Sequence, residues 1–146
     1  MREVAADDPV AVRLIEAMGA EMQARYGDGG LSPAQPQQFL APGTFLLAEL
    51  DGIAVGCGGV RPSGEDAAEI KRMYVDPAAR GRGIARGLLR ALVAHARARG
   101  LTRLLLETGT AQPEAISLYE SEGWTPVPPF GHYADDPRTR CYGLDL

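Results

Sequence analysis

The sequence predicts one mixed α/β domain, built on a central and mostly antiparallel sheet with flanking helices. Its 146 residues suit a single domain that buries a substantial core, so we expect one domain over residues 1–146. Two strand-like runs, at 44–50 and 53–60, lie a hairpin turn apart. Two more, at 68–75 and 104–107, bracket a helical stretch, and such a crossover makes the two strands parallel.

The N-terminal part of the chain predicts a short strand and two helices. We expect the strand at 2–5 and the first helix at 9–26, where apolar residues recur at helical spacing. Asp8 can cap the start of this helix, and the glycine-rich residues 27–30 should end it. A second, short helix is expected at 32–40.

The later elements are bounded by glycine and proline. Asp51-Gly52 is a favoured two-residue hairpin link, and Gly100 ends a strongly periodic helix at 84–99. A short strand is expected at 124–127, and the nearby prolines restrict it to the edge of a sheet or to a bend. The remaining predicted elements are loops at 62–66 and 109–112, a helix at 113–122 and a last strand at 140–146.

Composition excludes several classes of protein. Apolar residues make up 45% of the chain and charged residues 23%, which is ordinary for a soluble globular domain, and no apolar run is long enough to cross a membrane. The N-terminus lacks the apolar segment of a signal peptide, so we expect a cytoplasmic protein without membrane partners. Cys57 and Cys141 lie far apart and offer no zinc spacing, so we expect two reduced core thiols and no metal.

Charge is distributed unevenly along the chain. The net charge of −4 argues against nucleic acid as a partner. Between Pro77 and Leu106, however, there are seven arginines and no acidic residue. This local positive field suits a small polyanionic ligand. Four of these arginines are expected on a solvated surface: Arg90, Arg97, Arg99 and Arg103.

A glycine- and arginine-rich loop follows the strand at 68–75 and opens the helix at 84–99. A strand, a glycine loop and a helix N-terminus together form an anion site, because free backbone N–H groups converge there and the helix dipole adds positive potential. This loop lacks the G-K-[ST] of a P-loop, and as a dinucleotide fingerprint its third glycine, Gly87, comes one place late. It fits the pattern Arg/Gln-x-x-Gly-x-Gly/Ala at every fixed position. The matching residues are Arg80-Gly81-Arg82-Gly83-Ile84-Ala85, and Arg86 adds a further positive charge.

In this loop and in a later helix the chain resembles the GNAT N-acetyltransferase superfamily, from about Thr44 to the C-terminus. The helix carries the family-like pattern A-x-x-L-Y-x-x-x-G-(F/W/Y), written here by Ala115, Leu118, Tyr119, Gly123 and Trp124. Three stretches resemble a small bacterial subgroup of that superfamily: residues 106–109, 112–116 and 129–133.

The resemblance implies an acyl-CoA N-acyltransferase fold, in which the strands at 68–75 and 104–107 splay apart, and acetyl-CoA as cosubstrate. It assigns the pyrophosphate of coenzyme A to the loop of Arg80, Gly81, Arg82, Gly83, Ile84, Ala85 and Arg86. It assigns the pantetheine arm to the backbone of Met73, Tyr74 and Val75, which also offers N–H donors to an oxyanion. Gln112 is a further candidate for cofactor binding: it stands where many members have an asparagine that contacts the cofactor or caps the helix, and glutamine is a poorer cap.

The implied chemistry is transfer of an acetyl group to a primary amine of a small molecule, and it needs a base and an acid. The amine must lose a proton before it attacks, and the leaving thiolate must gain one. Two glutamates are candidate bases: Glu69, on the strand before the loop, and Glu107, which ends the next apolar strand. The two need not exclude each other. Tyr119 is the candidate acid, with core packing beside Trp124 as its alternative role.

The acceptor is left open by the sequence. Phe130, His132 and Tyr133 lie in a proline- and glycine-rich segment that could line its pocket. A protein acetyltransferase, acting on N-termini or lysines, would need an open groove, which residues 126–137 would narrow. A non-catalytic acyl-CoA-binding module is the other alternative. The implied fold often forms homodimers.

Overall fold

The computed structural model describes residues 1–27 and 31–146 and forms one seven-stranded mixed sheet, in the order β1-β2-β3-β4-β5-β7-β6. The strands are β1 (Arg2–Glu3), β2 (Thr44–Leu50), β3 (Ile53–Ser63), β4 (Ala67–Val75), β5 (Arg103–Gly109), β6 (Thr125–Val127) and β7 (Thr139–Asp145). The helices are α1 (Pro9–Tyr26), α2 (Ile84–Ala98) and α3 (Pro113–Ser121), with single 3₁₀ turns η1 (Pro36–Phe39) and η2 (Pro77–Ala79). All neighbouring strands are antiparallel except β4 and β5, which are parallel as predicted.

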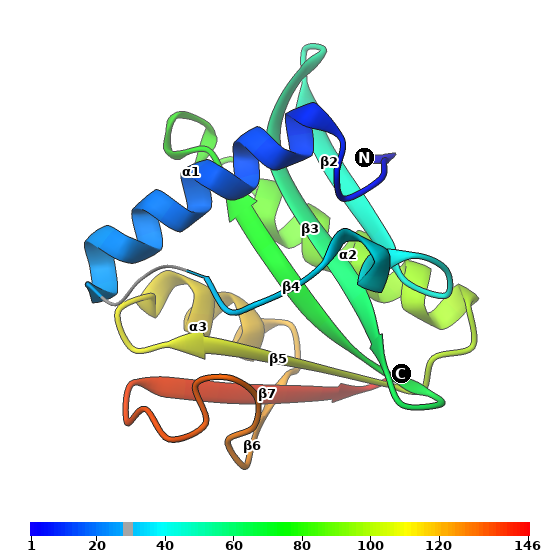
Figure 1. Ribbon diagram of the computed structural model, residues 1–146, viewed down its shortest axis with the longest axis vertical. Coiled ribbons are helices and arrows are strands. Elements are labelled where there is room, and N and C mark those ends of the chain that lie inside the picture. The colour runs from blue at the N-terminus through cyan, green and yellow to red at the C-terminus, as the bar shows by residue number, and fades with distance from the viewer. Residues whose placement is uncertain (28–30) are drawn as a thin grey trace.

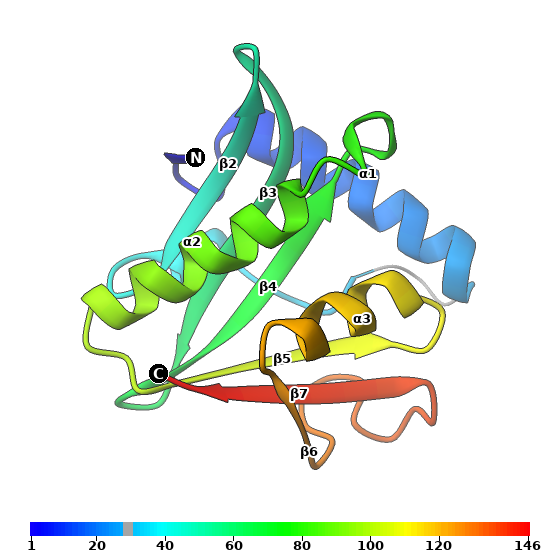
Figure 2. The same ribbon diagram turned by 180° about the vertical axis from the view of Figure 1, so that it is seen from behind.

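Helices cover both faces of the sheet. Figure 1 shows α1 and the segment leading to η1 across one face, and Figure 2 shows α2 and α3 across the other. Each face has its own apolar core. Leu88, Leu89 and Leu92 of α2 are buried in one core, and Leu14 of α1 packs near Phe45 in the other.

Local sequence signals explain most of the boundaries. The Asp8 side chain accepts a hydrogen bond from the backbone N–H of Val10, so it caps α1 as predicted. Gly27 ends α1 in the left-handed conformation, while the rest of the predicted 27–30 break lies outside the described residues. Asp51 and Gly52 both have positive φ angles, which is the hairpin geometry expected of that pair.

The predicted helix at 32–40 is wrong: only the turn η1 forms there. Pro36 has no N–H to donate and holds Gln35 in an extended conformation. Residues 31–35 therefore run as an extended segment across the sheet in front of β4 (Figure 1). This crossing segment (residues 31–35) forms part of the site described below.

The strands β4 and β5 pair over only part of their length. Their parallel register runs from Ala67 opposite Arg103 to Glu69 opposite Leu105 and then stops, although both strands continue. Beyond Glu69 they diverge into the V visible in Figure 1. The prediction that Glu107 ends its strand is wrong, since β5 continues to Gly109 because β7 pairs with it over that length. Glu107 consequently lies inside the V.

Candidate active site

A cavity opens where β4 and β5 separate. It encloses about 890 Å³ of space, open solvent included, between the two strands, the end of α1, the crossing segment and the loop before β7. The lining residues from the strands are Ile70, Lys71, Arg72, Met73, Leu106, Glu107, Thr108 and Gly109. The lining residues from elsewhere are Met18, Met22, Tyr26, Leu31, Ser32, Gln112, Tyr119, Tyr133, Asp136, Arg138 and Thr139.

A bulge in β4 shapes the part of the cavity that this strand lines. The register between β3 and β4 shifts between Cys57 and Gly59, and Arg72 adopts a φ angle of 60°. That is the left-handed region, which costs free energy for any residue except glycine. The bulge breaks the alternation of side chains, so that the neighbours Lys71 and Arg72 both reach Ser32 of the crossing segment.

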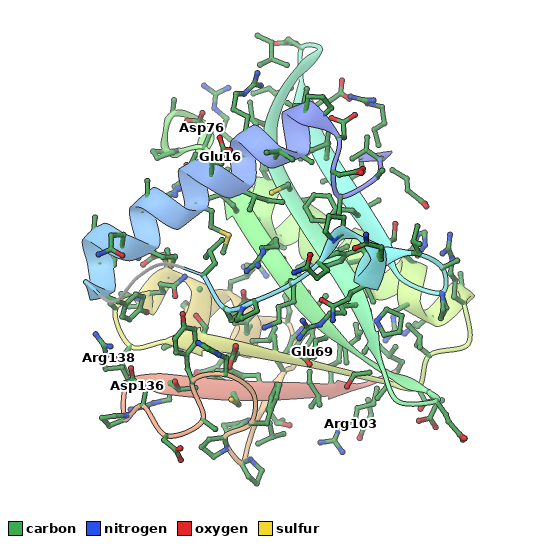
Figure 3. All side chains as sticks on the ribbon, viewed as in Figure 1. Glu16, Glu69, Asp76, Arg103, Asp136 and Arg138 are labelled. Atoms are coloured by element: carbon green, nitrogen blue, oxygen red, sulfur yellow. The ribbon has the colours of Figure 1, made fainter. Side chains whose placement is uncertain are left out.

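Both candidate bases contact the same lysine. The Lys71 ammonium lies 3.2 Å from Glu107 Oε1 and 3.7 Å from Glu69 Oε2, and it donates to Ser32 Oγ at 3.0 Å. Glu69 also pairs with Arg61 at 3.2 Å. In Figure 3, Glu69 lies close to where β4 and β5 meet. Glu69 is therefore held by two cations and is not among the residues lining the cavity, whereas Glu107 lines it.

The second carboxylate oxygen of Glu107 has unused capacity to accept hydrogen bonds. Oε2 is buried and accepts no hydrogen bond from the described residues. The Gly131 backbone passes so close that a Cβ there would come within 3.0 Å of this oxygen. Any larger residue at 131 would crowd the carboxylate, so the close approach of this backbone to Glu107 requires glycine.

Tyr119 combines a packing role with access to the cavity. Its ring centre lies 6.1 Å from that of Trp124 and 6.2 Å from that of Tyr142, as the packing alternative expected. Its side chain nevertheless lines the cavity. Burial raises the pKa of the phenol from 10 to about 12, so the hydroxyl stays protonated at physiological pH.

The glycine loop between η2 and α2 is free to receive an anion. Gly81 and Gly83 have φ angles of 81° and 78°, and nothing lies within 4 Å of the position a Cβ would occupy on either. Gly83 is the N-cap of α2, so the backbone N–H groups that follow it, at Ile84, Ala85 and Arg86, have no partner one turn earlier in the helix. The loop therefore fits a phosphate group.

The arginines of this loop are less free than the sequence suggested. Arg80 is bonded to Glu21 of α1 at 2.8 Å and to the Val75 carbonyl at 3.0 Å. Arg86 is paired with Glu122. Arg82 is exposed. To bind an entering diphosphate, Arg80 and Arg86 would have to exchange a carboxylate for it, whereas Arg82 makes no ion pair with the described residues.

Tyr26 and Gln112 are bonded to each other in the lining of the cavity. The Tyr26 hydroxyl donates to Gln112 Oε1 at 3.0 Å. Gln112 is the N-cap residue of α3, but its side chain makes no capping bond to that helix, as expected for glutamine. A Cβ on Gly109 would lie 2.2 Å from the Tyr26 hydroxyl. The close approach of Tyr26 therefore requires glycine at 109.

The predicted acceptor segment contributes one of its three residues. Tyr133 lines the cavity, whereas His132 is exposed beside the Tyr133 ring and Phe130 lies outside the lining. Asp136 and Arg138, which pair at 2.8 Å, also line it and lie together in the loop before β7 (Figure 3).

Sequence reasoning missed Ser32, Arg72 and Tyr26 as site residues. Sequence reasoning also missed Lys71, although it is the chain's one lysine beside fourteen arginines, which is a usable signal. No comparable signal marks Arg72, because its left-handed backbone arises from the β3–β4 register.

The two thiols take no part in the site. Cys57 and Cys141 are buried and free, and burial raises the pKa of Cys57 from 9 to about 12. Among residues 1–27 and 31–146, no cluster of histidine, cysteine and acidic side chains could hold a metal ion. In the same part of the chain, each helix is too short or too polar to cross a bilayer.

Comparison with known proteins agrees with this geometry. The model of the acetyltransferase (GNAT) family matches residues 4–124. An IAA acetyltransferase of Azospirillum brasilense is 42% identical over 144 residues, covering 93% of this chain and 90% of that protein. A crystal structure from Klebsiella pneumoniae, assigned to an acyl-CoA N-acyltransferase, has a TM-score of 0.83 at 35% identity and covers 99% of this chain and 95% of that one.

A more distant structure shares the fold alone. It is a GNAT family acetyltransferase of Elizabethkingia anophelis with acetyl-CoA bound, with a TM-score of 0.74 at 18% identity over 99% of this chain and 96% of that one. The fold is thus that of the acyl-CoA N-acyltransferases. This chain belongs to the GNAT acetyltransferase family.

Proposed function

We propose that this protein transfers the acetyl group of acetyl-CoA to the primary amine of a small molecule held in the cavity. The observation that carries the proposal is the V between β4 and β5, which brings the largely buried carboxylate of Glu107 and the protonated phenol of Tyr119 to one cavity. β4 connects this cavity to the glycine loop at the start of α2. A carboxylate, a phenol and a phosphate site along one strand suit attack on a thioester.

Acetyl-CoA fits the loop and the open edge of β4. The pyrophosphate would bind the N–H groups of Ile84, Ala85 and Arg86, with Arg80, Gly81, Arg82 and Gly83 around it. Past Glu69, β4 has no strand beside it on the β5 side, so the backbone at Met73, Tyr74 and Val75 can bond the pantetheine arm. Gln112 borders the same cavity. The structure of the Elizabethkingia protein with acetyl-CoA supports this choice of cosubstrate.

Glu107 is proposed as the base, acting directly or through a water, and Glu69 as the residue that positions Lys71. An alkylammonium has a pKa near ~10, so it must give up a proton before its nitrogen can attack. The nitrogen then forms a bond to the thioester carbonyl carbon, and a backbone N–H of 73–75 stabilises the oxyanion. The carbon–sulfur bond breaks, and the thiolate takes the proton of the Tyr119 hydroxyl. The nitrogen, which still carries one proton too many for a neutral amide, returns that proton to the Tyr119 oxygen.

A small acceptor is favoured over a protein. The crossing segment and the loop before β7 both border the cavity, and Ser32 is bonded to both Lys71 and Arg72. These contacts narrow the groove that a polypeptide would need.

The test is release of coenzyme A thiol from acetyl-CoA in the presence of a panel of small amines, with mass spectrometry of the product. We expect amine-dependent thiol release and an acceptor heavier by one acetyl group. Acetylation of peptides but of no small amine would instead indicate a protein acetyltransferase. Binding of acetyl-CoA without transfer to any amine or peptide would indicate a binding module.

A further inference from the structure

Most charged side chains that line the cavity are paired with a side chain of opposite charge. Lys71 is paired with Glu107 at 3.2 Å, and Arg138 is paired with Asp136 at 2.8 Å. Arg72, the fifth charged residue of the lining, has no carboxylate partner within residues 1–27 and 31–146. Within the part of the chain that the structure describes, Arg72 is therefore the lining cation whose charge no ion pair neutralises.

Most hydrogen-bond donors of Arg72 are not engaged by the described residues. Its guanidinium has five N–H donors, of which the structure engages NH2 in one bond, to the Ser32 carbonyl at 2.7 Å. Burial and the nearby charge of Arg61 both lower the pKa of Arg72, and neither compensates its charge. A half-buried arginine with unengaged donors and no carboxylate partner among the described residues can bind an anion through two parallel hydrogen bonds.

The backbone of Arg72 indicates that the placement is maintained for a purpose. The residue sits at a φ of 60°, where glycine would be free of strain. Strained backbone persists mostly at sites where the conformation serves binding or catalysis. Here it turns a second cation to the same face as Lys71, so that both reach Ser32.

We infer that the acceptor carries a carboxylate, which binds Arg72 while its amine lies at Glu107. This inference rests on the proposed function and names its substrate class: small amino acids, with amine and carboxylate a few bonds apart. The two ends of such a molecule match the two ends of a short chain of contacts, from Arg72 through Ser32 and Lys71 to Glu107.

The pyrophosphate of coenzyme A does not explain Arg72. Its proposed site is the start of α2, which lies on the opposite face of the sheet from the crossing segment that Arg72 contacts (Figures 1 and 2). A carboxylate could come instead from a dicarboxylic acyl group on the donor. The test separates these two sources.

The experiment compares matched acceptors, each an amino acid and its carboxamide: glycine with glycinamide, and phenylalanine with phenylalaninamide. We expect the unmodified protein to prefer the carboxylates by about 10- to 100-fold in kcat/KM, as one charge-assisted bidentate contact provides. R72Q should bring the ratio near one, and R72K should keep part of it. Comparing ratios between variants cancels the different basicity of the paired amines.

Controls separate the possible failures. R97Q, on the outer part of α2, should keep the full ratio, and the affinity for acetyl-CoA should be equal in all four proteins. Transfer to amines with no carboxylate preference in the unmodified protein, or the same preference in R72Q, would overturn the inference and leave the proposed function standing. Transfer to no amine despite bound acetyl-CoA would overturn the proposed function itself.

A last arm replaces acetyl-CoA by succinyl-CoA. We expect succinyl transfer to be slow and to change little in R72Q. Efficient succinyl transfer that R72Q abolishes, with acetyl transfer unchanged, would assign the carboxylate to the donor and overturn the inference.

Discussion

We propose separate tasks for the individual side chains at the V, and mutation should distinguish them. Glu107 lines the cavity and has an unbonded buried oxygen, whereas Glu69 is held by Arg61 and Lys71 outside the lining. We expect E107Q to lower kcat by about 10²- to 10⁴-fold, the usual contribution of a general base, with unchanged affinity for acetyl-CoA. E69Q keeps the size and shape of the side chain and should lower kcat much less than E107Q. An equal or larger loss in E69Q would transfer the base role to Glu69.

Tyr119 should act as an acid without contributing a structural hydrogen bond. Y119F should lower kcat by about 10- to 1000-fold while the free energy of unfolding at pH 7 changes little. Steady-state kinetics and urea unfolding measure the two effects. Equal rates for both proteins would leave Tyr119 with packing alone.

The raised pKa of Tyr119 also predicts how stability depends on alkaline pH. The phenol has a pKa of about 12 in the folded protein and about 10 when unfolded, so its contribution is complete below pH 10 and is lost as pH rises towards 12. Cys57, raised from 9 to about 12, acts in the same direction from pH 9 upward. Y119F should therefore lose less stability between pH 10 and 12, measured by urea unfolding at each pH. Parallel curves for the two proteins would contradict the assignment.

At the scale of elements, the start of α2 is the proposed phosphate site. G83E would direct a carboxylate into the backbone N–H groups at 84–86, and we expect it to abolish detectable binding of coenzyme A. G100E is a matched control: Gly100 follows the other end of α2 with a φ of 79° and open space around it. Both variants suffer the same backbone strain, so only charge at the loop distinguishes them. Equal affinities of G83E and G100E for coenzyme A, measured by calorimetry, would contradict the placement of the phosphate site at the start of α2.

Elements defined by nearby residues were predictable, and those defined by distant contacts were not. The cap at Asp8, the Asp51-Gly52 turn and the α2 periodicity each lie within a few residues of the boundary they set. The failure at 32–40 shows the reverse, because Pro36 holds the preceding residue extended and the segment's contacts are with distant residues of β4. Tyr119 was predicted from the helix motif and Glu107 from its place after an apolar run, whereas Arg72 depends on a bulge that only the β3–β4 register creates.

At the scale of the whole molecule, the parts of the site come from both ends of the chain. α1 supplies Tyr26, and Glu21 of the same helix holds Arg80 of the loop. Binding of acetyl-CoA should therefore stabilise the entire domain. At a concentration 100 times Kd the gain is about 2.7 kcal/mol, which for a chain of this size raises Tm by about 5–10 °C. A thermal melt with acetyl-CoA checks this, and G83E should show no shift.

The central claim is that the V between β4 and β5 joins an acetyl donor to an amine beside Glu107. The most direct measurement follows N-acetylated product and free thiol together, with acetyl-CoA and the amino acid panel, in the unmodified protein and E107Q. We predict equal amounts of product and thiol, and the loss of both in E107Q with acetyl-CoA still bound. Saturable binding of acetyl-CoA by the unmodified protein with no product from any amine would contradict the account.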